Sequence, residues 1–72
     1  MTKEELIRFT DFLDYFNVDW KSDVIKIGSG DFSVIMNPNT QWKDFLGYSI
    51  ANVAEVVAKE LNKKCIYISD ME

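Results

Sequence analysis

Side chains able to do covalent chemistry are scarce in this sequence. Cys65 is its one cysteine, and histidine is absent. A cysteine nucleophile needs a neighbouring base or cation to form its thiolate, and histidine most often serves as that base. Cys65 begins an apolar segment, which is typical of a small packed residue. With one cysteine and no histidine, the sequence also lacks the side chains that usually bind zinc. We therefore predict that the protein is not an enzyme and has no catalytic, cofactor-binding or metal-binding residues.

Residues 28–31 are the segment that comes nearest to a phosphate-binding loop. They read Gly-Ser-Gly-Asp, but the dinucleotide-binding fingerprint needs a third glycine and a helix directly after it. Asp19, Asp23 and Asp31 could meet near this turn, yet their spacing fits no calcium-binding loop. We interpret the segment as a β-hairpin turn, which would place one of its two glycines, at 28 or 30, at a positive φ angle.

A first amphipathic helix is predicted over residues 3–16. Thr2 and Glu5 have the spacing of a capping box, and apolar residues follow at steps of three and four. Glu4 and Arg8 are four residues apart, so we expect them to pair on the solvent side of this helix.

A second helix, predicted over residues 50–61, is the element around which the chain is organised. Its apolar stripe includes Val57 near the centre, and such a stripe needs a surface to cover. Ser49 is placed to cap the first turn. Asn62 is placed to end the helix in a left-handed conformation.

The remaining apolar segments predict strands. Residues 24–27 and 32–36 would form the two arms of a hairpin, and residues 65–68 a last strand. Residues 41–46, which follow a turn at Pro38, would form a short helix that covers the core. The order α-β-β-(short α)-α-β predicts one small α+β domain over residues 1–72. We expect a three- or four-stranded, mostly antiparallel sheet with both long helices on one face, the last strand parallel to the second and antiparallel to the first. A polar tail over residues 69–72 should fray.

Composition limits the classes of function. The net charge of −4 disfavours direct nucleic-acid binding, which depends on neutralising phosphates. The sequence has neither a run of about 20 apolar residues nor an apolar signal-peptide centre, so we expect no membrane association and a cytoplasmic location. Frequent Ile, Asn, Lys and Asp suggest an AT-rich bacterial or phage genome. A chain this short lies near the lower size limit for a stable core, so a homodimer would help it.

The helix-free face of the expected sheet is the candidate binding surface. Period-two alternation would direct seven apolar residues inward: Ile25, Ile27, Phe32, Val34, Met36, Ile66 and Ile68. It would direct Val24, Ile35, Cys65 and Tyr67 outward, with Trp20 extending that face. An apolar patch with a tyrosine on a charged domain is typical of a contact surface. We therefore predict protein binding through Trp20, Val24, Ile35 and Tyr67.

These features predict a small, non-catalytic cytoplasmic accessory or interaction protein, encoded by a phage or mobile element, that acts through a protein–protein surface on its sheet. The alternative is an acidic inhibitor that occupies the nucleic-acid-binding site of a basic protein. Salt dependence separates the two, because binding by the inhibitor should weaken steeply with salt.

Overall fold

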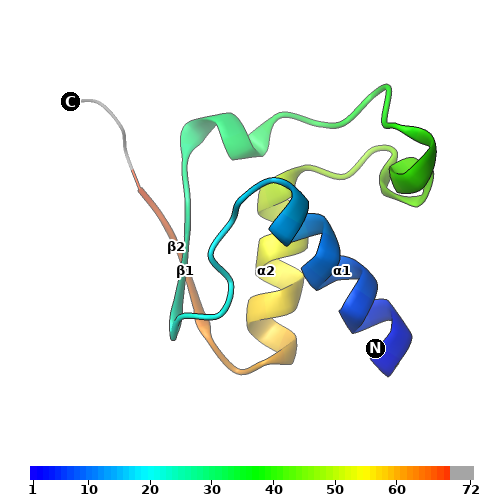
Figure 1. Cartoon of the computed structure of the whole chain (residues 1–72). Coiled ribbons are helices and arrows are strands. Elements are labelled where there is room, and N and C mark those ends of the chain that lie inside the picture. Colours follow the sequence, from blue (N-terminus) through cyan, green and yellow to red (C-terminus); the bar gives the residue numbers. More distant parts are fainter. Residues whose placement is uncertain (69–72) are drawn as a thin grey trace.

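The computed structural model describes residues 1–68, so the predicted polar tail lies outside the described residues. In chain order the elements are α1 (Lys3–Tyr15), β1 (Val24–Ile27), the 3₁₀ helices η1 (Ser29–Phe32) and η2 (Thr40–Phe45), α2 (Ile50–Glu60) and β2 (Lys64–Tyr67). In Figure 1, α2 lies between the two strands and α1. The protein is therefore an α+β domain in three layers.

The two long helices begin and end where their capping residues predict. Before α1, the Thr2 hydroxyl accepts from the Glu5 backbone N–H at 3.1 Å, and the Glu5 carboxylate accepts from the Thr2 N–H at 2.9 Å. Before α2, the Ser49 hydroxyl accepts from the Asn52 N–H at 3.1 Å. Asn62 has a φ angle of 58°, so the left-handed end of α2 is confirmed. No helix in the described part of the chain combines the length and apolarity needed to span a bilayer.

The predicted hairpin is wrong. Residues 29–32 form η1 instead of a two-residue turn, because the Asp31 carboxylate turns back and accepts from the Gly28 backbone N–H at 2.9 Å. Neither Gly28 nor Gly30 has a positive φ angle; among the described glycines only Gly47 does, at 87°. The chain therefore leaves the sheet after β1 instead of folding back beside it.

The expected second strand, residues 32–36, is not a strand of the sheet. Its single ladder contact is an antiparallel bridge between Val34 and Ser49. Phe32, Val34 and Met36 were expected in the core, yet all three are about half exposed or more. The segment runs outside the sheet, toward η2 (Figure 1).

The sheet has two strands within the described residues, and they are parallel. This corrects the three- or four-stranded, mostly antiparallel sheet predicted from sequence, and β2 is parallel to the first strand rather than antiparallel to it. With no hairpin arm available, the connection through η1, η2 and α2 returns β2 directly beside β1. Val24 is level with Lys64, and Ile27 with Tyr67.

The helices also differ in position from the prediction of both on one sheet face. α2 packs against β1 and β2, whereas α1 packs against α2. The core between α1, α2 and η2 is largely aromatic, and the rings of Phe12 and Phe45 are stacked with centroids 4.3 Å apart. Trp42 and Phe45 of η2 are buried, so the prediction that this segment covers the core is confirmed.

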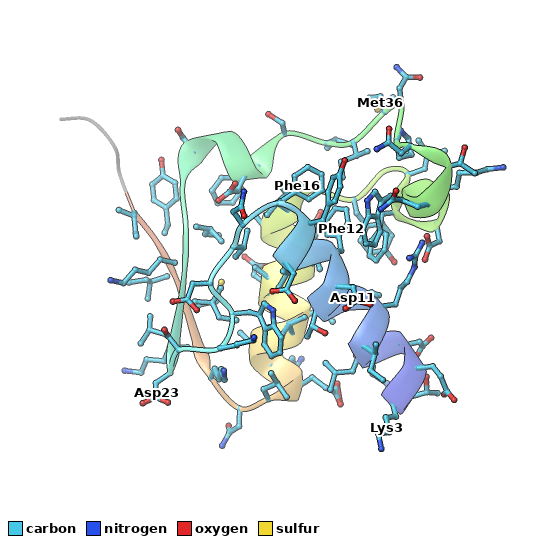
Figure 2. All side chains as sticks on the ribbon, in the orientation of Figure 1. Lys3, Asp11, Phe12, Phe16, Asp23 and Met36 are labelled. Carbon is cyan, nitrogen blue, oxygen red and sulfur yellow. The ribbon has the colours of Figure 1, made fainter. Side chains whose placement is uncertain are left out.

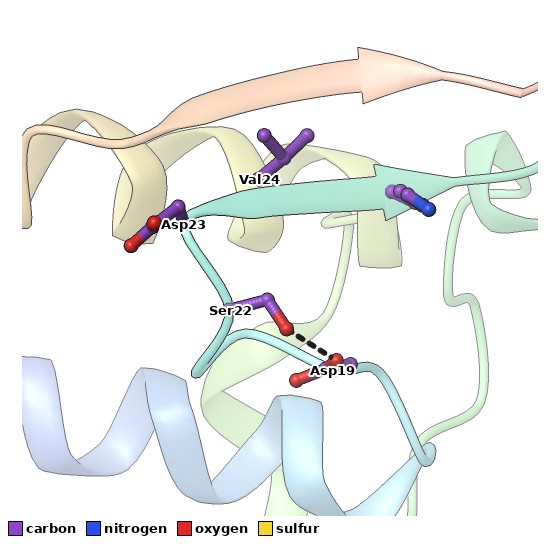
Figure 3. Close-up of a pocket in the computed structure, with 5 residues that line it drawn as sticks. Asp19, Ser22, Asp23 and Val24 are labelled. Carbon is purple, nitrogen blue, oxygen red and sulfur yellow. Dashed lines mark hydrogen bonds between the residues drawn. The ribbon is translucent and has the colours of Figure 1, made fainter.

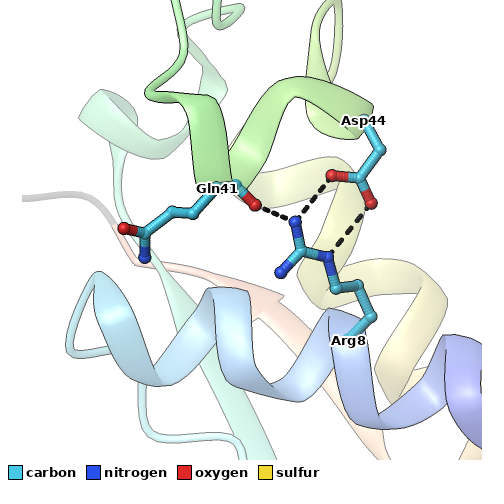
Figure 4. Close-up of polar contacts among 3 residues, drawn as sticks. All are labelled: Arg8, Gln41 and Asp44. Atoms are coloured by element: carbon cyan, nitrogen blue, oxygen red, sulfur yellow. Dashed lines mark hydrogen bonds and ion pairs between the residues drawn. The ribbon is translucent and has the colours of Figure 1, made fainter.

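An ion pair between Arg8 and Asp44 connects α1 to η2. Arg8 was expected to pair with Glu4, but its Nη2 lies 2.9 Å from Asp44 Oδ1, and it also donates to the Gln41 carbonyl (Figure 4). The hydrogen bond from Arg8 lowers the pKa of Asp44 below its usual value of 3.8. The guanidinium also lies 4.5 Å from the centre of the Trp42 ring. Arg8 therefore joins two elements that are distant in sequence.

Candidate protein-binding surface

No helix of the described part of the chain covers the face of the sheet turned away from α2. Facing α2, Ile25 and Ile27 are buried and Cys65 is partly buried. Cα partners in a parallel pair point to the same side. The opposite face therefore consists of Val24 with Lys64 and Lys26 with Ile66; we call these four residues the outer face. Val24 and Ile66 lie on one diagonal of this group of four, and Lys26 and Lys64 lie on the other.

The structure does not bring the four sequence-predicted site residues together. Val24 lies on the outer face, at the start of β1. Tyr67 is level with Ile27 and therefore points to the α2 side, where its ring lies 5.4 Å from that of Phe32. The other two, Ile35 and Trp20, are not in the strands.

Ile35 and Trp20 are the two that lie outside the sheet. Ile35 is partly buried against the core, and its backbone N–H donates to the Tyr48 carbonyl at 2.8 Å. Trp20 lies in the connector before β1, with its indole N–H donating to Asp14 at 2.9 Å and its carbonyl accepting from Lys63 Nζ at 2.6 Å. Ile35 thus packs inward, and Trp20 ties the connector to the end of α2.

The assignment of faces on the last strand is reversed. Cys65 and Tyr67 were expected outside and Ile66 and Ile68 inside, but the latter two are 42% and 41% exposed. A shift of one residue exchanges every side chain between the two faces of a strand. All four residues are apolar, so alternation gave no reason to prefer either face. The face is set by the end of α2, where the backbone N–H of Lys63 donates to the Ala58 carbonyl at 2.7 Å.

A groove of about 380 Å³ runs along the free edge of β1. Figure 3 shows it between β1 and the connector, with Asp23 at the start of the strand. The lining residues are Asp19, Ser22, Asp23, Val24 and Lys26. Ser22 Oγ donates to Asp19 Oδ2 at 2.7 Å, and this hydrogen bond lowers the pKa of Asp19. The β1 edge is therefore bordered by charged side chains.

The backbone of each strand directs alternate residues toward its partner and toward the free edge. The Ile68 N–H donates to the Ile27 carbonyl at 2.7 Å, so Ile27 faces β2, whereas Lys26 and Gly28 face the free edge of β1. The Gly28 N–H on that edge is already bound by Asp31. The accessible β1 edge is therefore short.

The free edge of β2 begins with an exposed lysine, Lys64, and its next three residues are uncharged. Ile66 and Ile68 face β1, so Cys65 and Tyr67 direct their backbone N–H and C=O groups outward. No strand among residues 1–68 pairs with this edge. Sequence analysis did not single out this edge, because the predicted sheet had more strands and no assigned strand order.

A second, smaller cavity of about 230 Å³ lies beside the aromatic core. Figure 2 shows Phe12 and Phe16, two of its lining residues, at the end of α1, and Met36 at the edge of the molecule. The other lining residues are Tyr15, Ile35, Asn37, Pro38, Asn39 and Trp42. The indole N–H of Trp42 is buried and has no acceptor among the described residues. The cavity carries no charged group that would select a ligand.

The Cys65 thiol and the possible metal-binding side chains are the reactive groups considered from the sequence. Burial, with a smaller contribution from Glu55, raises the pKa of the Cys65 thiol, which disfavours its thiolate. Within residues 1–68, no three His, Cys, Asp or Glu side chains come close enough together to hold a metal ion.

No family model, no curated protein and no solved structure matches the chain.

Proposed function

We propose that this chain is a non-catalytic protein-binding domain that acts through the outer face and open edges of its sheet. The observation that carries the proposal is that, within residues 1–68, the sheet has two parallel strands and is covered on one face only. Parallel sheets are almost always covered on both faces, and sheets of two strands are marginal on their own. A partner that covers the outer face or extends the sheet would supply what the isolated chain lacks.

The charges of the outer face indicate what kind of surface it would bind. Lys26 and Lys64 are exposed on either side of Ile66, although the chain as a whole has a net charge of −4. A partner surface with an apolar centre and acidic residues around it would complement this arrangement. The absence of histidine from the sequence and the raised pKa of Cys65 support binding rather than covalent catalysis. We place this activity in the bacterial cytoplasm, of a host or an infecting phage, on composition.

The test is capture of partner proteins by a charge-reversed variant. Lys26→Glu with Lys64→Glu should abolish capture, because it opposes acidic residues on the partner surface. Lys3→Glu with Lys59→Glu makes the same change in net charge at exposed positions on the two helices, so this control should retain capture. Equal capture by wild type and both variants would contradict the proposal. An acidic inhibitor remains the alternative prediction; it would show capture that weakens steeply with salt and is unaffected by the Lys26 and Lys64 changes.

A further inference from the structure

We infer that the outer face binds one amphipathic helix of a partner protein, whose apolar stripe contacts Val24 and Ile66 and whose acidic residues pair with Lys26 and Lys64. The inference rests on the proposed function and deepens it, because it names the element of the partner that covers this face. Ile66 is 42% exposed and Val24 is only partly buried. Both side chains therefore have apolar surface left to cover.

The sheet has the width of a single helix. Neighbouring strands lie about 4.8 Å apart, whereas a helix with its side chains is about 10–12 Å across. The opposite face shows this fit, since α2 packs there against both β1 and β2 (Figure 1). Parallel strands are typically covered by helices on both faces, whereas face-to-face packing of two sheets is typical of antiparallel strands. One helix therefore fits the outer face better than a second sheet does.

The register of the strands sets the direction of this helix. Val24 and Ile66 lie on one diagonal of the outer face, and Lys26 and Lys64 lie on the other. With about 3.3 Å per residue along a strand and about 4.8 Å between strands, each diagonal is about 8 Å long. Residues four positions apart in a helix are about 6 Å apart along its axis, so two of them can contact Val24 and Ile66. A helix along the apolar diagonal then has one lysine on each side.

The two lysines select an acidic helix. Both are exposed, and neither makes an ion pair within residues 1–68. Their long stems can lie along the apolar surface while the ammonium groups reach the sides of the helix. Carboxylates on both flanks of the apolar stripe would complement them, and basic residues there would be repelled. Asp23 directly precedes Val24, so the acidic residues of the helix should lie beside the lysines and not beyond Val24.

Titration of the full chain with two stapled helical peptides, each as long as α2, tests the inference. The acidic peptide has apolar residues at steps of three and four and Glu on both flanks of that stripe. The basic peptide has Lys in place of every Glu. The acidic peptide should bind saturably and shift the backbone NMR signals of Lys26 and Ile66. The basic peptide should bind about tenfold more weakly or less, because both of its flanks oppose lysines.

Charge reversal on the protein should reverse this preference. Lys26→Glu with Lys64→Glu should bind the basic peptide more tightly than the acidic one. Lys3→Glu with Lys59→Glu makes the same change in net charge at exposed helix positions, so this control should keep the preference of wild type. Circular dichroism should show that both variants remain folded. A reversal in the first variant alone separates binding at the outer face from general electrostatic attraction.

Four results would overturn the inference. One is the absence of saturable binding at about 1 mM acidic peptide, a concentration at which a site with a Kd of about 1 mM is half occupied. The second is equal binding of the two peptides. The third is new protection of the Cys65 and Tyr67 amides from hydrogen exchange, which would show strand addition at the β2 edge. The fourth is a dimer of the chain that Lys26→Glu with Lys64→Glu dissociates, which would make a second copy the occupant.

Failure of the inference and failure of the proposed function are distinguishable. Partner capture that depends on Lys26 and Lys64, without binding of the acidic peptide, would contradict the helix and leave the proposed function standing. Partner capture that the Lys26 and Lys64 changes leave unaltered would contradict the proposed function itself.

Discussion

Phe12 and Phe45 in the helical half of the molecule are almost completely buried, whereas Ile66 and Tyr67 in the sheet are 42% and 55% exposed. The helical half satisfies its apolar surface within one chain, because α1, α2 and η2 surround a shared aromatic core. Among residues 1–68, the sheet packs against α2 through one face, where Ile25 and Ile27 are buried. Most of the buried aromatic surface therefore lies between the helices, and the sheet contributes one buried face.

The largest effect is expected from Val57→Asp, which tests whether the helical half carries the stability. Val57 is fully buried in α2, and a buried carboxylate without a partner costs several kcal/mol, against a total of about 5–15 kcal/mol for a typical domain. Thermal unfolding followed by circular dichroism should show an unfolded chain. Val34→Asp, at an exposed position, should stay folded; equal melting temperatures for Val57→Asp and wild type would contradict the assignment of the core.

Truncation of one side chain in the helical half and one in the sheet compares the contributions of the two parts to stability. Phe45→Ala should lower the free energy of unfolding by about 3–5 kcal/mol, because it leaves a cavity beside Phe12. Ile66→Ala should lower it by less than about 1 kcal/mol in dilute, monomeric protein, since its side chain is half exposed. Urea unfolding measures both values. Similar losses for the two variants would mean that the sheet contributes as much to stability as the helices.

Glycine substitutions test the corrected turn. Gly47→Ala should destabilise by about 1 kcal/mol, because an L-residue is strained at a φ angle of 87°. Gly30→Ala should be close to neutral, since its φ angle is not positive and no atom lies within 4 Å of the added Cβ. A hairpin turn at residues 28–31 would give the reverse order in the same urea experiment.

Removal of the Arg8–Asp44 ion pair is expected to have the smallest effect on the free energy of unfolding. The folded state lowers the pKa of Asp44 below 3.8, so the pair stabilises the fold at pH values above that, and this contribution is lost as pH falls through the lowered pKa. Both side chains are well exposed, so the difference between wild type and Asp44→Asn should be below about 1 kcal/mol at neutral pH. It should shrink toward zero in acid. A difference that is constant with pH would show that Asp44 acts by packing instead.

Sequence patterns predicted the helices well because their signals are local. The Thr2–Glu5 box, the Ser49 cap and the left-handed Asn62 each depend on residues within one turn. The strands failed because their signals depend on partners distant in sequence. The glycines at 28 and 30 suggest a hairpin, whereas the structure has a 3₁₀ turn there, in which the Gly28 N–H donates to the Asp31 carboxylate.

The candidate surface was predicted only in part for the same reason. Val24 was placed on the outer face correctly, but nothing in the apolar run at 65–68 distinguishes Tyr67 from Ile66 as the exposed outer residue. The open edge of β2 follows from the strand order, which the local pattern does not contain. Of the four predicted residues, Val24 therefore lies on the expected face, Tyr67 lies on the opposite face of the same sheet, and Ile35 and Trp20 lie outside the strands.

The parallel register has a consequence for how the chain folds. Val24 and Lys64 are paired in the sheet although 40 positions separate them in the sequence (64 − 24). The chain between them forms a loop that must close before the two strands can pair. Closing so long a loop is entropically costly, and contacts of this kind slow folding. We expect β1 and β2 to join late, after α2 has docked on α1. During synthesis β2 emerges after α1, β1 and α2, so the sheet can form only once those three elements have been made.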